Sequence, residues 1–416
     1  MIAKSVDYVK VLIKWLAISL IIGALGGVLG SVFHILIDKA TELRGHHRWI
    51  IYLLPVGGLL ITYMYSIFKK DGKIDTNRVI LSIRDNQEIP LVMVPLIFVS
   101  TVITHLLGGS AGREGAALQL GGGIGYNFGK LLKLDGKDMH IIVRCGMSAV
   151  FAALFGTPLT ATIFALEVIR VGIFNYAGLL PCIMASVSAF GVSCAFGISP
   201  VRFQVAEISV LPGSVAKIIV LAILCAVVSI LFCMTIQKTE HFMKKSVVNR
   251  YLRTVVGAIA IVVLSLVFSS GDYNGAGTEI ISNAMKGIVK PEAFLMKIIF
   301  TAITIAAGFK GGEIVPAFFV GSTFGCVVAP LLGLDAAIAA AIGFVCLFCG
   351  VVNCPLASII LAYEVFGGTN IMLFAIACSV SYMMSGYFGL YNSQVFVYSK
   401  LTAEKIQNNI DNRKKL

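Results

Sequence analysis

Charged residues are scarce in this chain. Of its 416 residues, Lys, Arg, Asp and Glu together make up 13%, roughly half the share that is usual for a soluble globular domain. Hydrophobic residues reach 58%, and the mean hydropathy is +0.92. A soluble domain of this composition has too few polar groups to cover its surface. The composition therefore excludes a disordered protein, a secreted disulfide scaffold and an ordinary soluble enzyme, and it predicts a protein whose solvent is lipid.

Clusters of cysteine and histidine with metal-binding spacing are also missing. The ten cysteines lie in apolar runs. Cys346-Leu-Phe-Cys349 formally matches CxxC, but no second His or Cys cluster accompanies it to complete a metal or redox site. We therefore interpret the cysteines as small buried hydrophobic residues, and we expect neither a metal nor a cofactor.

The positive charge of the chain gathers at its two ends. The 33 Lys and Arg residues exceed the 21 Asp and Glu residues, which gives a formal net charge of +12. Because cytoplasmic segments of membrane proteins carry an excess of Lys and Arg, we predict that both termini are cytoplasmic. The protein is then a multi-pass protein of the cell membrane with an even number of spans and no nucleic-acid partner. The basic residues in question are Lys4, Lys10, Lys14, Lys405, Arg413, Lys414 and Lys415.

Continuous apolar stretches predict an all-α polytopic membrane protein. They lie near residues 11–37, 49–68, 89–108, 115–132, 141–169, 173–197, 210–236, 252–269, 292–309, 314–332, 336–365 and 370–390. Several are too short or too rich in glycine to be plain spans.

The second half of the sequence repeats the first at a nearly constant offset. We predict two membrane repeats, residues 1–210 and 211–416, the second with a short cytoplasmic tail. Transporters built from such repeats place the ion site at the repeat interface near the middle of the membrane. An odd number of spans in each half would invert the second repeat relative to the first. The matching segments are 101–108 and 301–308, 112–125 and 312–325, and 158–168 and 355–365.

A glycine-rich segment interrupts the helical pattern of the first half. Gly108-Gly-Ser-Ala-Gly-Arg-Glu-Gly115 ends one helix, and a new helix is predicted to start near Glu114. The free N–H groups and the positive dipole end of such a start bind anions. The Glu114 carboxylate would itself occupy that site and leave it on protonation, so one group can serve as gate and proton carrier. Lys310-Gly-Gly-Glu313-Ile-Val-Pro316 provides the equivalent break in the second half.

These motifs resemble the CLC family of chloride channels and proton-coupled anion antiporters, of the prokaryotic type without cytosolic regulatory domains. The resemblance implies a homodimer in the lipid bilayer with one pathway per subunit, which carries chloride or fluoride ions and, in antiporters, protons. It also implies that Glu114 is the gating glutamate. The central tyrosine of the family falls on Tyr391, with Tyr398 as a second candidate. The anion-binding residues implied are Gly112, Arg113, Gly115, Glu313, Ile314, Val315 and Tyr391.

The sequence departs from the chloride-selective pattern of that family. The first family motif is replaced by residues 72–77, which would place Ile74, beside Asp75, at a possible anion site. Glu313 stands where the second-half motif has Phe, and Val168 replaces the internal proton glutamate of the chloride antiporters. All three features resemble the fluoride/proton branch, although Val315 replaces the usual threonine of that branch.

We therefore expect transport of small halide anions by anion/proton antiport, with Glu114 as the protonatable gate, and not an enzyme. A passive voltage- or pH-gated chloride channel is the alternative, because Val168 is also typical of channels. An intramembrane serine hydrolase is a rival of another class, since Gly108-Gly-Ser110-Ala-Gly112 matches G-x-S-x-G. That motif requires a preceding strand and a His/Asp pair, whereas this context is helical and apolar.

Glu167 and Glu364 end apolar segments at equivalent positions of the two repeats. We predict that they pair structurally, with Arg170 or with a helix terminus, and take no part in transport.

Overall fold

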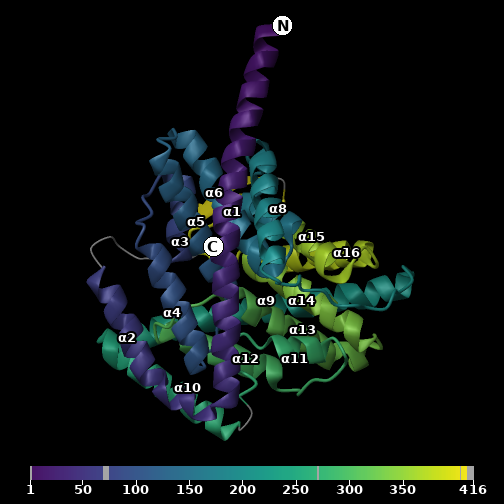
Figure 1. Cartoon of the computed structure of the whole chain (residues 1–416). Coiled ribbons are helices and arrows are strands. Elements are labelled where there is room, and N and C mark those ends of the chain that lie inside the picture. The colour runs from purple at the N-terminus through teal and green to yellow at the C-terminus, as the bar shows by residue number, and fades with distance from the viewer. Residues whose placement is uncertain (1, 69–74, 269–270, 403, 410–416) are drawn as a thin grey trace.

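The computed structural model describes residues 2–68, 75–268, 271–402 and 404–409, and this part of the chain is mostly helical (Figure 1). The helices before residue 210 are α1 (Ile2–His46), η1 (Arg48–Leu53), α2 (Leu54–Ile67), α3 (Thr76–Asp85), α4 (Met93–Leu107), α5 (Glu114–Leu131), α6 (Gly136–Phe155), α7 (Pro158–Glu167), η3 (Tyr176–Gly178) and α8 (Leu179–Ala195). Those after it are α9 (Pro212–Ser246), α10 (Arg250–Val267), α11 (Thr278–Ala284), α12 (Ala293–Ala306), α13 (Ile314–Leu332), α14 (Ala336–Val352), α15 (Pro355–Phe366) and α16 (Ile371–Met384).

The helices are those of a membrane protein. Among the described residues, seven helical stretches are long and apolar enough to cross a bilayer. Large apolar side chains stay exposed along α1, α2 and α10, for example Leu25, Leu60 and Val263, as is expected of surfaces that face lipid. Figure 1 shows α1 running along the whole molecule, with its N-terminal turns projecting beyond the other helices.

Two apolar stretches that read as continuous in the sequence are each divided into two helices. Residues 141–169 form the end of α6 and all of α7, and Pro158 opens α7. Residues 336–365 form α14 and α15, and Pro355 opens α15. Proline is favoured in the first turn of a helix but cannot continue one, because it lacks the N–H group. Hydropathy alone does not register such a break, since both sides of it are equally apolar.

The helix pairs α5–α6 and α13–α14 pack through glycines that match across the repeats. A side-chain carbon on Gly121 would lie 2.6 Å from the carbonyl carbon of Gly146, and one on Gly321 would lie 2.7 Å from that of Gly343. Such contacts are too close for any residue larger than glycine, and they let the backbones approach as membrane helices with small residues do. This packing carries the starts of α5 and α13 into the interior.

Two glutamates each cap a helix of the other repeat. Glu167, at the end of α7, accepts hydrogen bonds of 3.2 and 2.9 Å from two backbone N–H groups in the first turn of α15. Glu364, in α15, accepts bonds of 3.0 and 2.8 Å from the first turn of α7. The prediction that these acids pair with a helix terminus is confirmed. A carboxylate there satisfies free N–H groups and meets the positive end of the helix dipole.

A small sheet that the sequence did not indicate ties the C-terminal segment to the end of α7. It contains β1 (Arg170–Val171), β2 (Val395–Tyr398) and β3 (Lys405–Asn409). β1 pairs with β2 in parallel, and β2 pairs with β3 in antiparallel orientation. Strands this short have too few residues to show the alternation by which a strand is recognised.

We expect Glu167→Ala to lower the free energy of unfolding by about 1–2 kcal/mol, because two buried N–H groups of α15 lose their acceptor. Glu364→Ala should have a similar effect through α7. Thermal unfolding of the detergent-purified protein measures the loss. Glu42→Ala, which changes an exposed glutamate of α1, is the control and should stay within about 0.5 kcal/mol of the parent. Equal melting temperatures for Glu167→Ala and Glu42→Ala would contradict the capping role.

Candidate functional site

The two glycine-rich breaks predicted from the sequence lie against each other. Gly112 and Gly312 form an antiparallel bridge, in which the Gly112 N–H donates to the Gly312 carbonyl at 2.7 Å and the Gly312 N–H donates back at 2.6 Å. A side-chain carbon on Gly312 would clash with the backbone of Gly115, so the contact requires glycine. Helices α5 and α13 start immediately after the bridge, at Glu114 and Ile314. Both helix starts therefore meet at one place.

Threonine hydroxyls support this contact with the same symmetry. Thr104 Oγ1, on α4, accepts a hydrogen bond of 3.3 Å from the backbone N–H of Lys310, and Thr304 Oγ1, on α12, accepts one of 3.0 Å from that of Ser110. The buried Ser110 hydroxyl lies 3.0 Å from Thr301 Oγ1. The segment before Ser110 is the helix α4 rather than a strand. The turn therefore lacks the strand that a nucleophilic serine elbow requires.

Glu114 lies between the two helix starts, as predicted. It is the first residue of α5 and is completely buried. Its Oε2 accepts a hydrogen bond of 2.9 Å from the backbone N–H of Arg113, and the backbone of Val315 in α13 also interacts with this carboxylate. Its Oε1 has no hydrogen-bond partner among the described residues. Backbone groups from both repeats thus contact the Glu114 carboxyl here.

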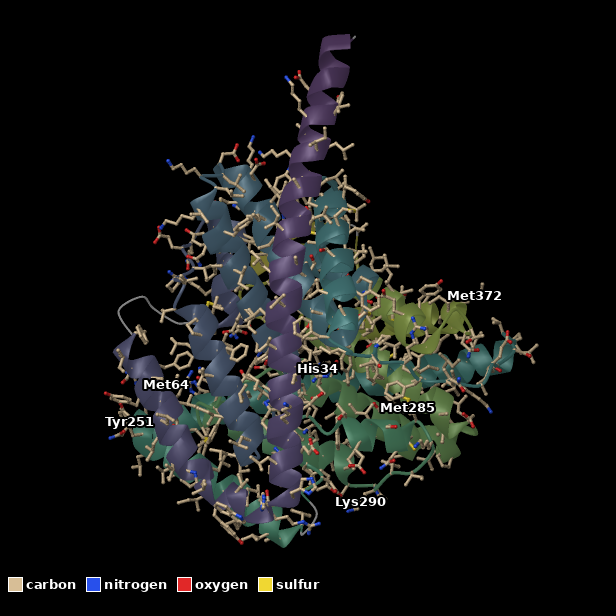
Figure 2. All side chains as sticks on the ribbon, in the orientation of Figure 1. His34, Met64, Tyr251, Met285, Lys290 and Met372 are labelled. Atoms are coloured by element: carbon tan, nitrogen blue, oxygen red, sulfur yellow. The ribbon has the colours of Figure 1, made fainter. Side chains whose placement is uncertain are left out.

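The Arg113 side chain connects this carboxylate to α1. Its Nε lies 3.7 Å from Glu114 Oε1, and its Nη1 lies 3.0 Å from Asp38 Oδ1. The other oxygen of Asp38 lies 2.9 Å from His34 Nε2. Figure 2 shows His34 on the stretch of α1 that runs along the other helices. Our sequence reasoning missed His34 and Asp38, although two ionisable residues one helical turn apart within an apolar helix are a recognisable signal.

Glu313, Ile314 and Val315 form the start of α13. Glu313 is the N-terminal flanking residue of this helix and is half-buried, whereas Ile314 and Val315 are buried in its first turn. A side-chain carbon on Gly115 would lie 3.6 Å from Glu313 Oε2, which places the Glu313 carboxyl beside the start of α5. At the repeat offset Glu313 matches Arg113 and Ile314 matches Glu114. The two helix starts are therefore alike in backbone but different in chemistry.

Tyr391 is buried beside both acids. Its side chain is 2% exposed, and its hydroxyl has no hydrogen-bond partner among the described residues. The carboxyls of Glu313 and Glu114 both act on it electrostatically. Tyr398, the second candidate, lies in β2 and is 45% exposed. Of the two tyrosines, the structure brings Tyr391 to the paired helix starts.

A polar cavity lies on the Tyr391 side of the paired helix starts. It has a volume of about 180 Å³, and its wall includes Asp75, Gln119, Glu240, Lys310, Glu313 and Tyr391. A second cavity of about 490 Å³ shares Asp75, Glu240 and Lys310 with it and extends to the exposed Lys244. Two neighbouring cavities lined in part by polar and charged groups therefore lie between Lys244 at the surface of the protein and the Glu313 and Tyr391 side chains.

The structure describes only the end of the segment 72–77, which replaces the first motif of the family. Ile74 lies outside the described residues. Asp75 flanks the start of α3 and accepts a hydrogen bond of 3.2 Å from the backbone N–H of Arg78. Thr76 Oγ1 donates to the carbonyl of Gly115 at 3.3 Å. The start of α3 thus packs on the start of α5, and the Asp75 carboxyl faces the cavity.

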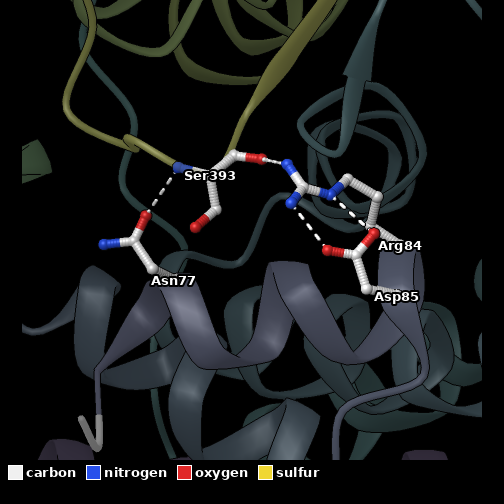
Figure 3. Close-up of polar contacts among 4 residues, drawn as sticks. All are labelled: Asn77, Arg84, Asp85 and Ser393. Atoms are coloured by element: carbon white, nitrogen blue, oxygen red, sulfur yellow. Dashed lines mark hydrogen bonds and ion pairs between the residues drawn. The ribbon is translucent and has the colours of Figure 1, made fainter. Parts of the chain in front are cut away.

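Helix α3 also holds the turn that carries Tyr391 (Figure 3). Asn77 Oδ1 accepts a hydrogen bond of 3.0 Å from the Ser393 N–H, and Arg84 Nη1 donates to the Ser393 carbonyl at 2.9 Å. Arg84 also forms two hydrogen bonds with Asp85, of 2.9 and 2.6 Å, and they lower the pKa of this carboxyl. The turn near the end of the chain is therefore fixed by side chains from the first repeat.

Comparisons with known proteins agree with this geometry. Residues 57–386 match the family model described as voltage gated chloride channel. A chloride/fluoride channel protein of Pseudomonas syringae pv. tomato is 36% identical over 405 residues, which cover 95% of this chain and 90% of the relative. An H(+)/Cl(-) exchange transporter of Vibrio campbellii is 23% identical over 85% of this chain and 82% of the relative.

Two solved structures share the fold. The crystal structure of a CLC-type fluoride/proton antiporter aligns with a TM-score of 0.89 and 33% identity over 92% of this chain and 98% of that one. A slow cyanobacterial Cl-/H+ antiporter aligns with a TM-score of 0.78 and 20% identity over 89% of this chain and 94% of that one. The family model, the relatives and the paired helix starts lead to the same conclusion: the chain belongs to the voltage-gated chloride channel (CLC) family.

Proposed function

We propose that this protein moves small halide anions, chloride or fluoride, across a membrane in exchange for protons, with Glu114 as the gate. The observation that carries the proposal is the position of the Glu114 carboxylate, which is fully buried between two helix starts and is held by backbone N–H groups. Such a place binds an anion without a fixed counter-ion. The names of the fluoride/proton antiporter and the Cl-/H+ antiporter that share the fold support this function.

Exchange follows from competition for the same N–H groups. When Glu114 is ionised, its carboxylate occupies them, and a halide ion finds no free donors. A proton neutralises the carboxylate and weakens its hydrogen bonds with the N–H groups, because charge-assisted bonds are the stronger kind. The side chain then leaves, and a dehydrated halide takes its place. The occupied states therefore alternate between a carboxylate and a halide with a protonated acid. Exchange results when the acid releases its proton on the side from which the halide arrives, so that the two ions cross in opposite directions.

Two further groups favour fluoride over chloride as the better substrate. Fluoride is smaller and more strongly hydrated, so a site that selects it must supply several close donors. The Tyr391 hydroxyl is buried without a partner among the described residues, and a protonated Glu313 would offer a second O–H group on the same cavity wall. The relative named as a fluoride/proton antiporter at 33% identity supports this choice.

The assembly and the orientation belong to the same proposal. The family resemblance implies a homodimer with one pathway per subunit. The basic residues near both ends favour cytoplasmic termini, and the repeat favours two halves of opposite orientation, residues 1–210 and 211–416. The first-motif position Ile74 remains part of the proposed anion site on the resemblance alone.

We expect Glu114→Gln to abolish proton transport while fluoride or chloride flux continues, because the amide can vacate the site but cannot carry a proton. Parallel recordings of halide efflux and proton uptake in proteoliposomes measure both. Glu42→Gln, at an exposed position of α1, should keep both fluxes. An unchanged halide-to-proton ratio in Glu114→Gln would refute the gate.

A pH gradient separates antiport from a passive channel. Coupled exchange moves the reversal potential away from the Nernst potential of the anion, whereas a channel leaves it there. We expect the parent protein to show the displacement and Glu114→Gln to lose it. A parent protein that stays at the Nernst potential would identify a channel.

We expect Glu313→Ala to reduce the preference for fluoride over chloride by roughly tenfold or more, because a hydrogen bond to a charged group contributes roughly 1.5–3 kcal/mol. Efflux rates of the two ions from identical proteoliposomes measure the ratio. Glu240→Ala removes another acid from the same cavity wall and should leave the ratio unchanged. Equal effects of the two substitutions would show that the cavity's charge, not a direct contact, sets the preference.

A further inference from the structure

A chain of four ionisable side chains leads from the surface of the protein to the gate. His34 Nε2 lies 2.9 Å from Asp38 Oδ2, Asp38 Oδ1 lies 3.0 Å from Arg113 Nη1, and Arg113 Nε lies 3.7 Å from Glu114 Oε1. The side chain of Asp38 is 57% exposed, that of Arg113 12% and that of Glu114 0%. The contact chain therefore joins an exposed carboxylate to a buried one.

Arg113 is shared between two carboxylates. An arginine in a protein stays charged, so its single positive charge is divided between Asp38, which neutralises part of it, and Glu114. His34 and Arg113 are the ionisable side chains that contact Asp38, and Arg113 also lies beside Glu114. Any change in the charge of the His34–Asp38 pair therefore alters how much of the guanidinium charge is available to Glu114.

His34 is the member of the pair that can gain a positive charge, because a neutral imidazole becomes a cation when its second ring nitrogen is protonated. Its Nε2 faces Asp38, whereas its Nδ1 is buried without a hydrogen-bond partner among the described residues. The neutral ring therefore donates its proton from Nε2 to Asp38. A second proton, on Nδ1, would make the ring a cation one helical turn from the carboxylate that holds Arg113.

Other ionisable groups lie near the pair: on α1 itself, Lys39 directly follows Asp38, and Glu42, which is 72% exposed and faces His46, lies one helical turn further on. Arg113 and Glu114 approach α1 from the start of α5, and His105 lies on α4, which also packs against α1. The His105 ring bonds to the Thr101 carbonyl, and Arg44, on α1 itself, donates to the His105 carbonyl. Neither group contacts Asp38, so the His34–Asp38 pair acts on the gate through Arg113.

We propose that the His34–Asp38 pair tunes the gate: a proton taken up by His34 offsets the charge of Asp38, strengthens the hold of Arg113 on ionised Glu114 and so opposes protonation of the gate. His34 is a positioning residue in this arrangement, since it acts through Asp38 and Arg113. The inference rests on the proposed function of Glu114. It predicts that the rate of halide transport rises less steeply on acidification than it would in a protein that lacks His34.

The test is the pH dependence of halide efflux from proteoliposomes loaded with the full-length protein. In His34→Gln the side chain keeps a donor for Asp38 but never becomes charged, so we expect the midpoint of acid activation to move to higher pH by roughly half a unit to one unit. In Asp38→Asn the charge of Arg113 is no longer shared, so the midpoint should move to lower pH. A merely structural role would reduce the rate in both variants without shifting the midpoints in opposite directions.

The matched control is His46→Gln. His46 also pairs with an acid one turn away on α1, at 3.8 Å from Glu42, but the two side chains are 73% and 72% exposed. We expect its profile to match the parent. A shift of the same size in His46→Gln, or no shift in His34→Gln, would overturn the proposal.

Two further measurements keep the outcomes distinct. The halide efflux of Glu114→Gln should not depend on pH, and a pH dependence like that of the parent would refute the proposed gate. If Glu114→Gln loses the pH dependence but His34→Gln keeps the midpoint of the parent, only the tuning role is refuted. Nuclear magnetic resonance of ¹³C-labelled histidine, with the His34 signal identified by its loss in His34→Gln, reports the titration directly. A His34 ring that takes up no proton between about pH 5 and 8, the range in which histidine ordinarily titrates, would also overturn the proposal.

Discussion

The pair of hydrogen bonds between Gly112 and Gly312 is the contact on which the rest of the site depends. Helices α4 and α12 end just before this contact, and α5 and α13 begin just after it. Each break would leave buried backbone groups unsatisfied, because lipid offers no hydrogen bonds. Each loop provides the partners of the other. The bridge also brings the starts of α5 and α13 together, so that the N–H groups left over converge on one small volume. The anion-binding character that we propose for that volume is a consequence of how the breaks are satisfied.

The two repeats share their scaffold but not their chemistry. The threonine contacts of Thr104 and Thr304 and the helix caps of Glu167 and Glu364 recur in both directions across the interface. Yet the residue that opens α5 is an acid, whereas Ile314 opens α13. The first residue of α5 therefore carries a carboxyl group, whereas the carboxyl group at the other start belongs to Glu313, which precedes α13. The gate that we propose therefore lies at only one of two starts that are alike in backbone.

Several ionisable side chains buried within the described part of the chain have backbone groups as their partners. Glu167 and Glu364 sit on helix starts, and Glu114 accepts from a backbone N–H. Lys297, which is completely buried, donates to two carbonyls of the loop before α11, at 3.1 and 2.7 Å. Backbone dipoles are fixed by the fold and need no partner that could itself change charge. Arg113 differs, because it is shared between two carboxylates, and in our proposal this makes it the point where the surrounding charge reaches the gate.

Much of this could be predicted from the amino-acid sequence, because the relevant signals are local. Hydropathy identifies the membrane helices, and consecutive glycines before Glu114 and Glu313 identify where helices break. The nearly constant offset between the repeats identifies which segments correspond. The capping role of Glu167 and Glu364 also follows, since it depends on position in the repeat. The division of residues 141–169 and 336–365, and the short sheet of β1, β2 and β3, escaped prediction because apolar composition is the same on both sides of a break and the strands are very short.

Only the tertiary structure decided which distant groups meet. The repeat indicates that Gly112 and Gly312 correspond, but not that they bond to each other, because correspondence in sequence carries no distance. Likewise the His34–Asp38 pair is visible as two ionisable residues in an apolar helix, while its contact with Arg113 depends on how α1 crosses the start of α5. Tyr391 lies at the site and Tyr398 does not, because Asn77 of α3, in the first half of the chain, bonds to the turn that carries Tyr391. The chemistry of a single segment follows from residues that are neighbours in the sequence. The arrangement of the site is set by packing between helices that lie far apart in the sequence.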